Sequence, residues 1–527
     1  EFTYPVEALS KTEKLETTHI HDFLLTHPRA QAIDLKSLCP LIEEAFPVVW
    51  TGIAEDDGFN RLIVEAKMAW GDAVILRALA RYLLQTGISF SQRYMEQSLI
   101  ENAKIGEQIV QLFRTKFDAD FAGGPAAREA RQNDLHADIL KKLEGVQNLD
   151  QDRILRRFLN LLDAILRTNY FQRTDAGEAP ETLTFKLDSR KIEGLPLPCP
   201  LVEIFVYSPR FEGVHLRFAR IARGGIRWSD RREDFRTEIL GLVKAQFVKN
   251  AVIVPSGAKG GFVPKRLPAN GTREEIQNEG IACYKQFVTS LLGITDNLAS
   301  EELDASPEPP ARVVCVDPPD PYLVVAADKG TATFSDTANA IAKDKHFWLG
   351  DAFASGGSNG YDHKVMGITA KGAWEAVKRH FREAGKDVQN EAFTVIGVGD
   401  MSGDVFGNGM LCSPKIQLIA AFDHRDIFID PNPDMTASYA ERVRMFKLPR
   451  SSWQDYDRTA ISKGGGVFSR SAKSIPLSPE ARLALGVSAA SLSPPDLIRA
   501  ILKAQVELLW FGGIGTYVKA KAERHAD

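Results

Sequence analysis

The sequence predicts an α/β protein in which a helical N-terminal region is followed by two domains that each contain a β-sheet. Three observations support this fold class. Apolar residues recur every three or four positions from Phe59 to about Gly145, as they do in amphipathic helices. From Thr182 the period changes to two, which is typical of half-buried strands. From Phe393 a β-rich run enters a group of glycines and then a helical pattern, as in an open parallel sheet covered by helices.

The composition is that of a large globular chain. It has 527 residues, of which 44% are hydrophobic and 25% charged, and this length predicts about three domains. We place them at residues 1–175 (helical), 176–385 (mixed sheet) and 386–527 (parallel sheet). The net charge of −4 gives no reason to expect nucleic acid or an acidic membrane as a partner. No apolar run approaches the roughly 18 residues that span a bilayer, and no signal peptide is recognisable.

The cysteines and the chain ends give two further expectations. Five cysteines are scattered in a spacing that fits no zinc site, so we expect reduced thiols, a cytoplasmic protein and no metal. The chain begins at Glu1-Phe2 without a methionine and stops soon after a strand and a glycine turn. We therefore expect it to be a fragment of a longer polypeptide, whose last domain is truncated at its C-terminus.

The helical region is predicted to be a scaffold. Gly87 follows the first periodic run as a stop, Ser89 or Ser91 caps the next helix, and Ala122-Gly-Gly-Pro breaks it. None of these segments carries a recognisable chemical motif. The predicted helices are Leu62–Leu83, a second one that ends near Phe113, Ala126–Leu143 and Leu155–Tyr170.

The middle of the chain is predicted to contain two kinds of strand. The first kind alternates between apolar and polar residues, and the second is short and apolar, as buried strands are. A helix is expected at Asn270–Leu292 and a proline-rich loop at Ser300–Pro310. The predicted strands are Thr182–Leu187, Val202–Tyr207 and Val214–Ala222, then Val252–Val254, Val313–Val316 and Leu323–Ala326.

Three cations in this region are candidates for a binding site. Arg223-Gly-Gly-Ile-Arg227 is predicted to form a glycine turn after a strand, and Lys249 closes a helical pattern that begins near Asp234. Lys259 lies in Ser-Gly-Ala-Lys-Gly-Gly, where its glycine neighbours would let the backbone approach a ligand. If the three converge, they form a site for an acidic small molecule. The alternative is a pair of solvated basic loops. An ATP-binding loop is excluded, because no Ser or Thr follows Lys259 to bind magnesium.

Asp328 is a candidate acid–base group. It follows a predicted strand and precedes a helix that we expect Ser335 to cap. This position suits proton exchange with a ligand at the end of the strand. The alternative is an aspartate that stabilises its own turn, and the residues alone favour that alternative.

The glycine-rich segment after Phe393 predicts a site for a dinucleotide. In Gly397-Val-Gly399-Asp-Met-Ser-Gly, a strand meets a helix N-terminus, where a pyrophosphate can bind. Ser402 takes the position of the third glycine, and its small side chain still permits close helix–strand packing. Asp400 is unfavourable beside a pyrophosphate unless its side chain points away. We predict a Rossmann-like domain in which Gly397, Gly399, Met401 and Ser402 contact the cofactor.

Asp423 predicts the kind of dinucleotide. It ends the next predicted strand, Ile416–Phe422, 20 residues beyond Gly403, where a carboxylate can bind the adenine ribose hydroxyls. The same carboxylate would repel a 2′-phosphate, so NAD is predicted rather than NADP, although Arg425 lies nearby. A helix from Ser493 to Gln505 and a strand Val506–Trp510 continue the domain. The glycine-rich stretch from Gly464 to Lys473 could be another ligand loop, but its spacing assigns it no role.

These motifs together resemble those of a known family. Arg223-Gly-Gly-Ile-Arg, Lys249-Asn and Gly257-Ala-Lys-Gly-Gly follow one another as in the substrate-binding segment of the glutamate dehydrogenases. The longer sequence motif, which includes Trp228-Ser-Asp-Arg and Val254-Pro-Ser-Gly-Ala-Lys, resembles that of the large NAD-dependent glutamate dehydrogenases of bacteria. The resemblance extends from the helical region to the end of the chain.

The resemblance implies a reaction, a cofactor and a role for each candidate residue. The reaction would be oxidative deamination of L-glutamate to 2-oxoglutarate and ammonia by a homo-oligomer, with NAD as the hydride acceptor. Arg223 would bind the γ-carboxylate, where many smaller relatives have lysine, and Lys249 the α-carboxylate. Lys259 would activate water, and Asp328 would carry the proton to and from nitrogen. Thr369, which opens a predicted helix to Ala384, would contact the nicotinamide amide, although it could also be only a helix cap.

Two other functions remain open from the sequence. A dehydrogenase of an apolar amino acid would need an apolar residue in place of Arg223, so it ranks lower. A non-catalytic nucleotide-binding fragment is the second alternative. Turnover with glutamate and NAD distinguishes these functions.

Overall fold

A computed structural model gives the structure of the chain, and it divides into two compact units. The first unit comprises Glu1–Arg81, Ser89–Lys116 and Gly123–Leu159, and the second comprises Tyr82–Ile88, Phe117–Ala122 and Asn160–Asp527. The structure describes residues 35–174, 176–247, 254–269, 271–298, 305–327, 334–350, 362–449, 451–512 and 519–523.

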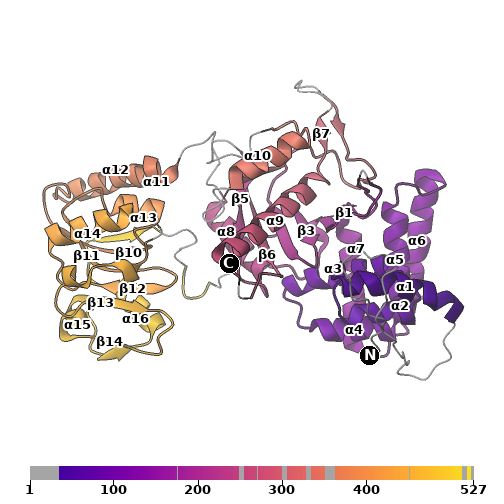
Figure 1. The fold of residues 1–527 in the computed structure, drawn as a ribbon, viewed down its shortest axis with the longest axis horizontal. Coiled ribbons are helices and arrows are strands. Elements are labelled where there is room, and N and C mark those ends of the chain that lie inside the picture. Colours follow the sequence, from indigo (N-terminus) through magenta and orange to yellow (C-terminus); the bar gives the residue numbers. More distant parts are fainter. Residues whose placement is uncertain are drawn as a thin grey trace, which may run out of the picture. The chain divides into compact units, whose positions relative to one another are not determined.

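The first unit is helical, as the apolar periodicity predicts (Figure 1). Leu62, Leu76 and Leu79 are fully buried, so the predicted apolar stripe does form the core. Of the two candidate serines, Ser91 is the N-cap of α4 and accepts a hydrogen bond from the Tyr94 N–H at 3.3 Å. The helices are α1 (Leu35–Trp50), α2 (Arg61–Glu65), α3 (Trp70–Gln85), α4 (Gln92–Glu101), α5 (Ala103–Phe117), α6 (Gly124–Leu143) and α7 (Leu149–Ala164).

The second unit contains a mixed seven-stranded sheet with the order β1-β2-β3-β4-β6-β5-β9. Strands β1 to β4 and β6 pair antiparallel in this order, whereas β6, β5 and β9 are parallel to one another. The strands are β1 (Ile165–Thr168), β2 (Leu183–Leu187), β3 (Val202–Tyr207), β4 (Phe211–Arg217), β5 (Ala222–Trp228), β6 (Ser256–Pro264) and β9 (Val324–Ala327). The short strands β7 (Asn297–Leu298) and β8 (Pro307–Glu308) form a separate antiparallel pair.

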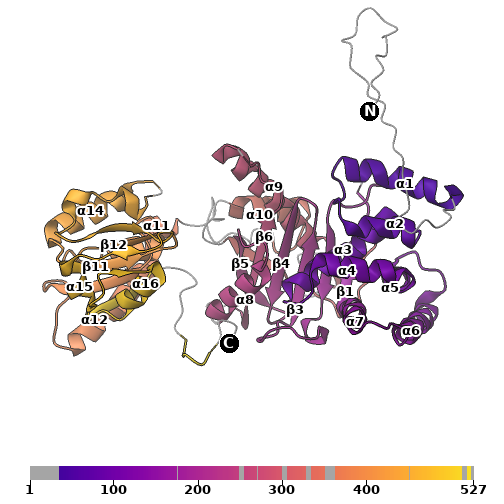
Figure 2. The same cartoon turned by 90° about the horizontal axis from the view of Figure 1, so that it is seen from below.

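Helices cover both faces of this sheet. Helix α8 (Phe235–Gln246) packs on one face, and α9 (Arg273–Leu292) and α10 (Ser335–Asp344) pack on the other (Figure 2). Helix α9 begins with a capping box formed by Thr272 and Glu275. The core between α9, α10 and the sheet includes Ile226, Phe262 and Phe287, all fully buried.

Four predicted elements in this sheet are wrong in detail. The predicted helix Leu155–Tyr170 ends at Ala164, and the residues that follow form β1. The predicted strand Val214–Ala222 is interrupted after Arg217, so the glycine pair at 224–225 lies inside β5 and not in a turn. Val313–Val316 forms no strand, and Ser335 is the first helical residue of α10 after its N-cap Phe334.

The second unit also contains a five-stranded sheet with the order β13-β12-β11-β10-β16. Strands β16, β10 and β11 are parallel, and β12 and β13 are antiparallel to their neighbours. The chain passes from β10 to β11 on one side and later returns to β16 on the other side of β10. This reversal at β10 is the place where open α/β sheets bind ligands. The strands are β10 (Phe393–Val398), β11 (Ile416–Phe422), β12 (Asp426–Ile429), β13 (Gly466–Ser469) and β16 (Leu508–Phe511).

Two apolar clusters hold helices on the two faces of the five-stranded sheet. One joins Trp374, Phe406 and Met445 to Phe393, and the other joins residues such as Leu497 to the opposite face. The fold is therefore the predicted α/β class, with a helical region, a mixed sheet and a Rossmann-like sheet. The remaining elements are α11 (His363–Met366), α12 (Ile368–Glu383), α13 (Asp404–Gly409), α14 (Met435–Lys447), α15 (Pro479–Leu485), α16 (Pro494–Leu502), β14 (Ile475–Pro476) and β15 (Ser491–Leu492).

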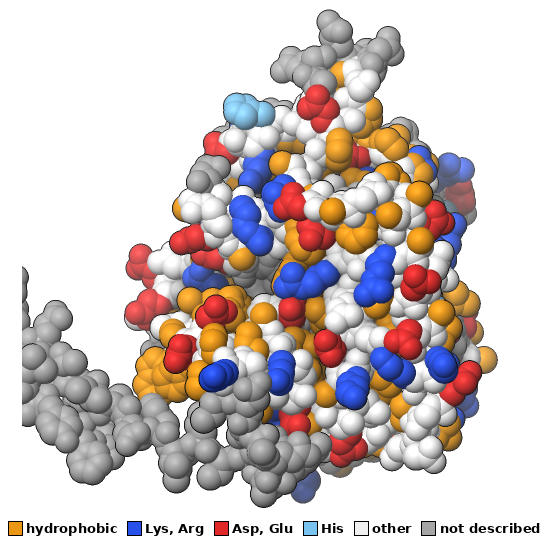
Figure 3. Space-filling view, turned by 90° about the vertical axis from the view of Figure 1, so that its right-hand side faces the viewer, with side chains coloured by type: hydrophobic (Ala, Val, Ile, Leu, Met, Phe, Trp, Pro, Cys, Tyr) orange, Lys and Arg blue, Asp and Glu red, His pale blue; other side chains and the backbone are white. Residues whose placement is uncertain are grey.

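The surface agrees with the balanced composition. On the face drawn in Figure 3, acidic and basic side chains are interspersed and do not separate into patches of one sign. None of the helices in the described ranges is long and apolar enough to cross a membrane. All five cysteines lie within the described residues, and each is a free thiol.

Candidate active site

Arg223 and Lys259 lie on the adjacent parallel strands β5 and β6 of the seven-stranded sheet. Arg223 of β5 is paired with Gly257 of β6, and Lys259 is two residues further along β6. Paired residues point to the same face and every second residue of a strand does so too. The two side chains therefore share a face, and the strand spacing places their Cα atoms roughly 8 Å apart.

Helix α8 covers this face. Gly261 follows Lys259 by two residues, and a Cβ added to it would lie 2.3 Å from Cδ1 of Ile239 in α8. Arg227 of β5, on the same face as Arg223, forms an ion pair of 2.7 Å with Glu238 of α8. Arg223 is half-buried, while Lys259 is fully buried and has a partner in the protein. The alternative of a solvated basic loop is thus wrong for Lys259, because Ser256–Pro264 forms a buried strand.

Close contact between the two strands explains the first glycine of this motif, Gly224. A Cβ added to Gly224 would lie 1.4 Å from the carbonyl oxygen of Ala258, a distance that no side chain permits. The glycine therefore lets β5 approach β6 next to Lys259. It is needed for strand contact, and not for the turn that the sequence predicts.

Two other candidate residues lie outside the described residues. Lys249 follows α8, whose last described neighbour is its C-cap Phe247. Asp328 follows β9, whose last residue, Ala327, is paired with Ile226 of β5. The roles of Lys249 and Asp328 therefore stay predictions.

The predicted dinucleotide motif has the local geometry of such a site. Gly397 packs closely against Phe406: a Cβ added to Gly397 would lie 2.5 Å from the phenylalanine ring. Gly399 has φ +138°, which few other residues adopt, and a Cβ there would lie 2.8 Å from Cβ of Phe406. Gly403 is the N-cap of α13 and offers no side chain to its first N–H groups. These features leave backbone room and open donors beside a helix N-terminus.

The residues between these glycines are held by their own turn. Asp400 is 6% exposed, and its Oδ1 accepts hydrogen bonds from the Ser402 N–H, at 2.8 Å, and from the Ser402 hydroxyl. The Asp400 carboxylate is thus hydrogen-bonded within the turn. This agrees with the condition that its side chain points away from a bound pyrophosphate. The Met401 side chain is fully buried in the apolar core, so only its backbone is available to a ligand.

Asp423 ends β11, as predicted, and its carboxylate is held from one side. Its Oδ1 accepts hydrogen bonds of 2.7 Å from the N–H groups of Arg425 and Asp426. Its Oδ2 is buried and has no hydrogen-bond partner among the described residues, although Nη2 of Arg425 lies 3.8 Å away. A buried acceptor without a donor fits the hydroxyls of an adenine ribose.

Thr369 and the unassigned glycine stretch are also located. Thr369 is the second residue of α12 and is exposed, and Gly367 is the N-cap of that helix, so Thr369 is not the cap. The glycines at 464–466 lead into the edge strand β13, and a Cβ on Gly465 would lie 2.5 Å from the carbonyl oxygen of Ile429. Arg470, just after β13, donates a hydrogen bond of 2.6 Å to the carbonyl oxygen of Asp423. No spacing of residues along the chain indicates this contact, because it depends on strand pairing.

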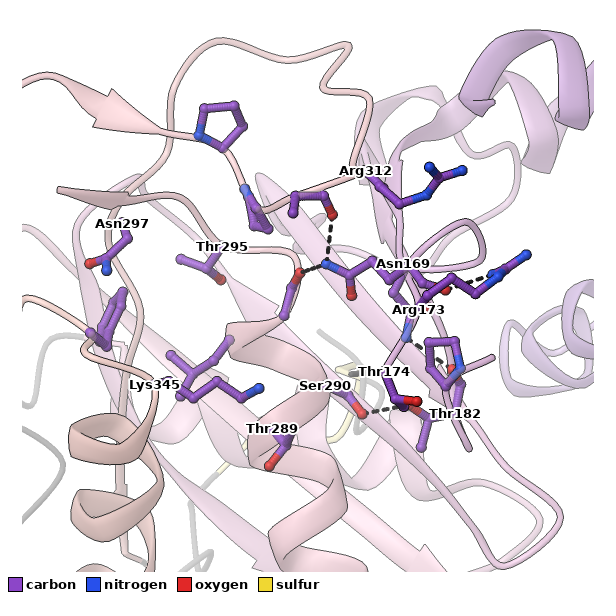
Figure 4. A pocket seen from close by; sticks show the side chains of 18 of the residues that line it. Asn169, Arg173, Thr174, Thr182, Thr289, Ser290, Thr295, Asn297, Arg312 and Lys345 are labelled. Carbon is purple, nitrogen blue, oxygen red and sulfur yellow. Dashed lines mark hydrogen bonds between the residues drawn. The ribbon is translucent and has the colours of Figure 1, made fainter. Parts of the chain in front are cut away.

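A separate pocket of about 680 Å³ lies beside the C-terminal end of α9 (Figure 4). Its polar groups bond to one another, as the 2.7 Å contact between the hydroxyls of Thr182 and Ser290 shows. Of the predicted site residues that the structure describes, none lines this pocket. Within the described ranges no group of three His, Cys, Asp or Glu side chains could hold a metal ion.

The fold and these residues define an α/β protein with a Rossmann-like domain and a basic site on a mixed sheet. The chain matches the family described as bacterial NAD-glutamate dehydrogenase, catalytic domain, over residues 138–527, and glutamate dehydrogenase, helical motif 3, over residues 54–119. It therefore belongs to the family of bacterial NAD-glutamate dehydrogenases.

Similar proteins of known name support this membership. The NAD-specific glutamate dehydrogenase of Pseudomonas aeruginosa is 57% identical over 96% of this chain, and that of Halomonas elongata is 54% identical over 96%. The NAD-specific glutamate dehydrogenase of Mycobacterium tuberculosis is 57% identical over 92% of the chain. The chain spans only 30–31% of the length of these curated relatives.

Proposed function

We propose that this chain is the catalytic part of an enzyme that oxidatively deaminates L-glutamate to 2-oxoglutarate and ammonia with NAD. Family membership and the names of the relatives support this reaction. The observation that carries it is the shared face of Arg223 and Lys259, two cations brought together on adjacent strands. The γ-carboxylate of glutamate needs a cation such as Arg223, whereas the side chain of an apolar amino acid does not.

The substrate roles are those that the resemblance to the glutamate dehydrogenases implies, and the charge of each residue suits its role. Arg223 binds the γ-carboxylate, for which the planar guanidinium can offer two parallel hydrogen bonds. Lys249 binds the α-carboxylate. Lys259 takes a proton from the water that adds to the iminium carbon, and its burial excludes other water from the reacting centre. Asp328 carries protons to and from the substrate nitrogen.

The cofactor roles follow from the Rossmann-like sheet. Gly397, Gly399 and the backbone of Met401 and Ser402 would hold the pyrophosphate, and Asp423 the adenine ribose. Thr369 would bind the nicotinamide amide. NAD, when bound, accepts the hydride that leaves Cα of glutamate. The balanced reaction converts glutamate, NAD⁺ and water to 2-oxoglutarate, NADH, an ammonium ion and a proton.

The organisation of the protein is part of the same proposal. We assign residues 1–175 to a helical region, 176–385 to the substrate domain and 386–527 to the nucleotide domain. The reaction would take place in the cytoplasm, in a homo-oligomer. Five reduced thiols and a balanced surface charge agree with this location.

Turnover with glutamate and NAD tests the proposal, in the longest polypeptide that contains the chain. NADH formation monitored by its absorbance should require glutamate and should be much slower with leucine or norvaline. Lys259→Ala should abolish turnover and leave NADH binding intact, since Lys259 lies outside the Rossmann-like sheet.

The same assay separates the two proton-transfer roles. Asp328→Asn should lower kcat by roughly 10²- to 10⁴-fold with little change in KM for glutamate. NADH binding without any glutamate-dependent turnover in the wild-type protein would instead favour the non-catalytic nucleotide-binding alternative. Near-normal turnover in either variant would reject the role of that residue.

A further inference from the structure

Helix α8 covers the face of the sheet that carries Arg223 and Lys259, so its stability matters for the candidate active site. Its first turn also touches the site directly, because Glu238 pairs with Arg227 at 2.7 Å on the strand of Arg223. Fraying of this turn would release Arg227.

Helix α8 lacks a cap from its own sequence. Asp234 occupies the N-cap position, and aspartate is normally a good cap, but its side chain makes no capping hydrogen bond among the described residues. The reason is Arg231, whose guanidinium binds both carboxylate oxygens of Asp234, with Nε at 2.9 Å from Oδ1. The ion pair with Arg231 thus occupies the Asp234 carboxylate that would otherwise cap the helix.

Gln85, in the last turn of α3, supplies the missing cap. Its Oε1 accepts a hydrogen bond of 3.3 Å from the N–H of Arg236, the second residue of α8. Its Nε2 donates bonds of 3.2 Å to the carbonyl oxygens of Arg232 and Glu233, just before the helix. Gln85 is 5% exposed, and it belongs to the segment 82–88 that clusters with the sheet unit. The amide side chain of Gln85 therefore binds backbone groups both before the first residue of α8 and within its first turn.

A buried ion network fixes the same turn to the sheet. Arg236 of α8 binds Glu203 of β3 through two nitrogens, with Nε 2.8 Å from Oε2, and Tyr82 donates its hydroxyl to the same oxygen at 2.8 Å. All three side chains are fully buried. Glu203 is paired with Leu216, which is paired with Lys259, so Glu203 and Lys259 lie in one row on one face. Burying these charges costs desolvation energy, so a fixed geometry explains the network better than stability does.

We propose that Gln85 and Tyr82 are positioning residues for the substrate site: they cap and anchor α8 over Arg223 and Lys259. Because this inference rests on the proposed function, its effect is expected on glutamate and not on the cofactor. The role passes through α8, since neither residue lies on the strands of the site.

Gln85→Ala tests the inference in the longest polypeptide that contains the chain. We expect KM for glutamate to rise at least fivefold and kcat/KM to fall at least tenfold, while KM for NAD and the NADH dissociation constant stay within twofold. Hydrogen exchange should quicken at the amides of residues 236–239. Gln92→Ala is the matched control, because the hydrogen bonds of Gln92 with Arg81, Asp57 and Glu96 all lie within the helical unit. It should change none of these values.

A second substitution distinguishes capping from general damage. Arg231→Ala frees Asp234 to cap α8, so Gln85→Ala/Arg231→Ala should recover kcat/KM for glutamate to within threefold of the wild type. Tyr82→Phe should show a smaller change of the same kind, because Arg236 still binds Glu203. Unchanged glutamate kinetics in Gln85→Ala, or no recovery in the double variant, would overturn the inference. If the wild type does not turn over glutamate, the proposed function fails, and the exchange rates alone decide whether Gln85 caps α8.

Discussion

Arg223 and Lys259 share one sheet face but differ in their access to solvent. Arg223 is half-buried, so a substrate carboxylate can reach it, whereas Lys259 is fully buried under α8. Substitution of Arg223 should therefore change which substrate binds, and substitution of Lys259 should change whether the reaction proceeds. The two residues can be tested by different measurements.

Arg223→Leu should change substrate preference. We expect kcat/KM for glutamate to fall about 10²-fold or more, because the γ-carboxylate would be desolvated without a cation. Norvaline has no side-chain carboxylate, so its kcat/KM should fall far less. Arg220→Leu is the control, since Arg220 is exposed and precedes β5, and it should leave both values unchanged. Equal losses for both substrates in Arg223→Leu would make Arg223 structural.

Asp423 should determine the choice between NAD and NADP. Its buried Oδ2 receives no hydrogen bond from any residue that the structure describes, so it fits a ribose hydroxyl, but it would repel a 2′-phosphate. We expect NADH to bind at least tenfold more tightly than NADPH, which corresponds to about 1.4 kcal/mol. Asp423→Ser should narrow this ratio, because Arg425 and Arg470 remain beside the site. Fluorescence titrations of both cofactors measure it, and equal wild-type affinities would remove Asp423 from the ribose site.

At the scale of elements, the contact between β5 and β6 depends on Gly224. Gly224→Ala should destabilise the protein by more than about 3 kcal/mol, because the new Cβ would meet the carbonyl oxygen of Ala258 and force the strands apart. Gly241 of the neighbouring helix α8 is the matched control, since a Cβ there meets no atom within 4 Å. Gly241→Ala should stabilise the protein by up to about 1 kcal/mol. Urea unfolding measures both changes, and similar values would contradict the strand-contact argument.

Elements with a strong local signal could be predicted from the sequence. β3 and β11 have the predicted boundaries, because their residues pack and pair along the whole predicted run. The end of α7 could not be predicted, since Ile165 continues the helical spacing while hydrogen bonds to β2 make it a strand. Likewise, the glycines at 224–225 favour a turn locally, and only pairing with β6 and β9 places them in a strand.

The irregular segment before β9 could not be predicted from the sequence for a different reason. Val313–Val316 looks like a buried strand, but the prolines that follow it cannot join a ladder. Instead, Asp317 and Asp320 bind buried cations of the sheet, with Lys186 2.7 Å from Asp320. Such long-range ion pairs leave no local signal in the sequence.

The candidate site was predicted through residue types rather than through geometry. The motifs identify Arg223, Lys259 and Asp423, and the structure gives each a buried or strand-end position. The hydrogen bond by which Gln85 caps helix α8 could not be found from residue types, because Asp234 at the N-cap position is already a residue that commonly caps helices. Only the ion pair with Arg231 reveals that this cap is occupied.

At the scale of the whole molecule, buried ionisable groups connect stability to pH. Asp320 is a carboxyl group whose ionised form is stabilised by folding. Burial raises its pKa, but the charges of Arg217 and Lys186 lower the pKa by more than burial raises it, so the net shift is downward. It therefore contributes stability above the ordinary aspartate pKa, and this contribution is lost as the pH falls through the lowered value. His215 acts at a higher pH and can be isolated more easily.

His215 of β4 should make the protein less stable in mild acid. It is 2% exposed, and burial, helped by the charge of Arg217, lowers its pKa to about 3. An unfolded histidine has a pKa near 6.5, so between these values the unfolded chain binds a proton that the folded chain does not. Stability is therefore complete above about pH 6.5 and falls as the pH drops toward 3, by about 2 kcal/mol between pH 7 and pH 5.

Urea unfolding of His215→Leu at both pH values tests this prediction. Within the described part of the chain, Nε2 of His215 has no hydrogen-bond partner, so leucine leaves no described polar group unsatisfied there. The loss of unfolding free energy between pH 7 and pH 5 should be about 2 kcal/mol smaller in the variant than in the wild type. His380→Leu, at an exposed position of α12, should retain the wild-type loss. An equal loss in His215→Leu would mean that His215 is protonated in the folded sheet, which its burial beside Arg217 opposes.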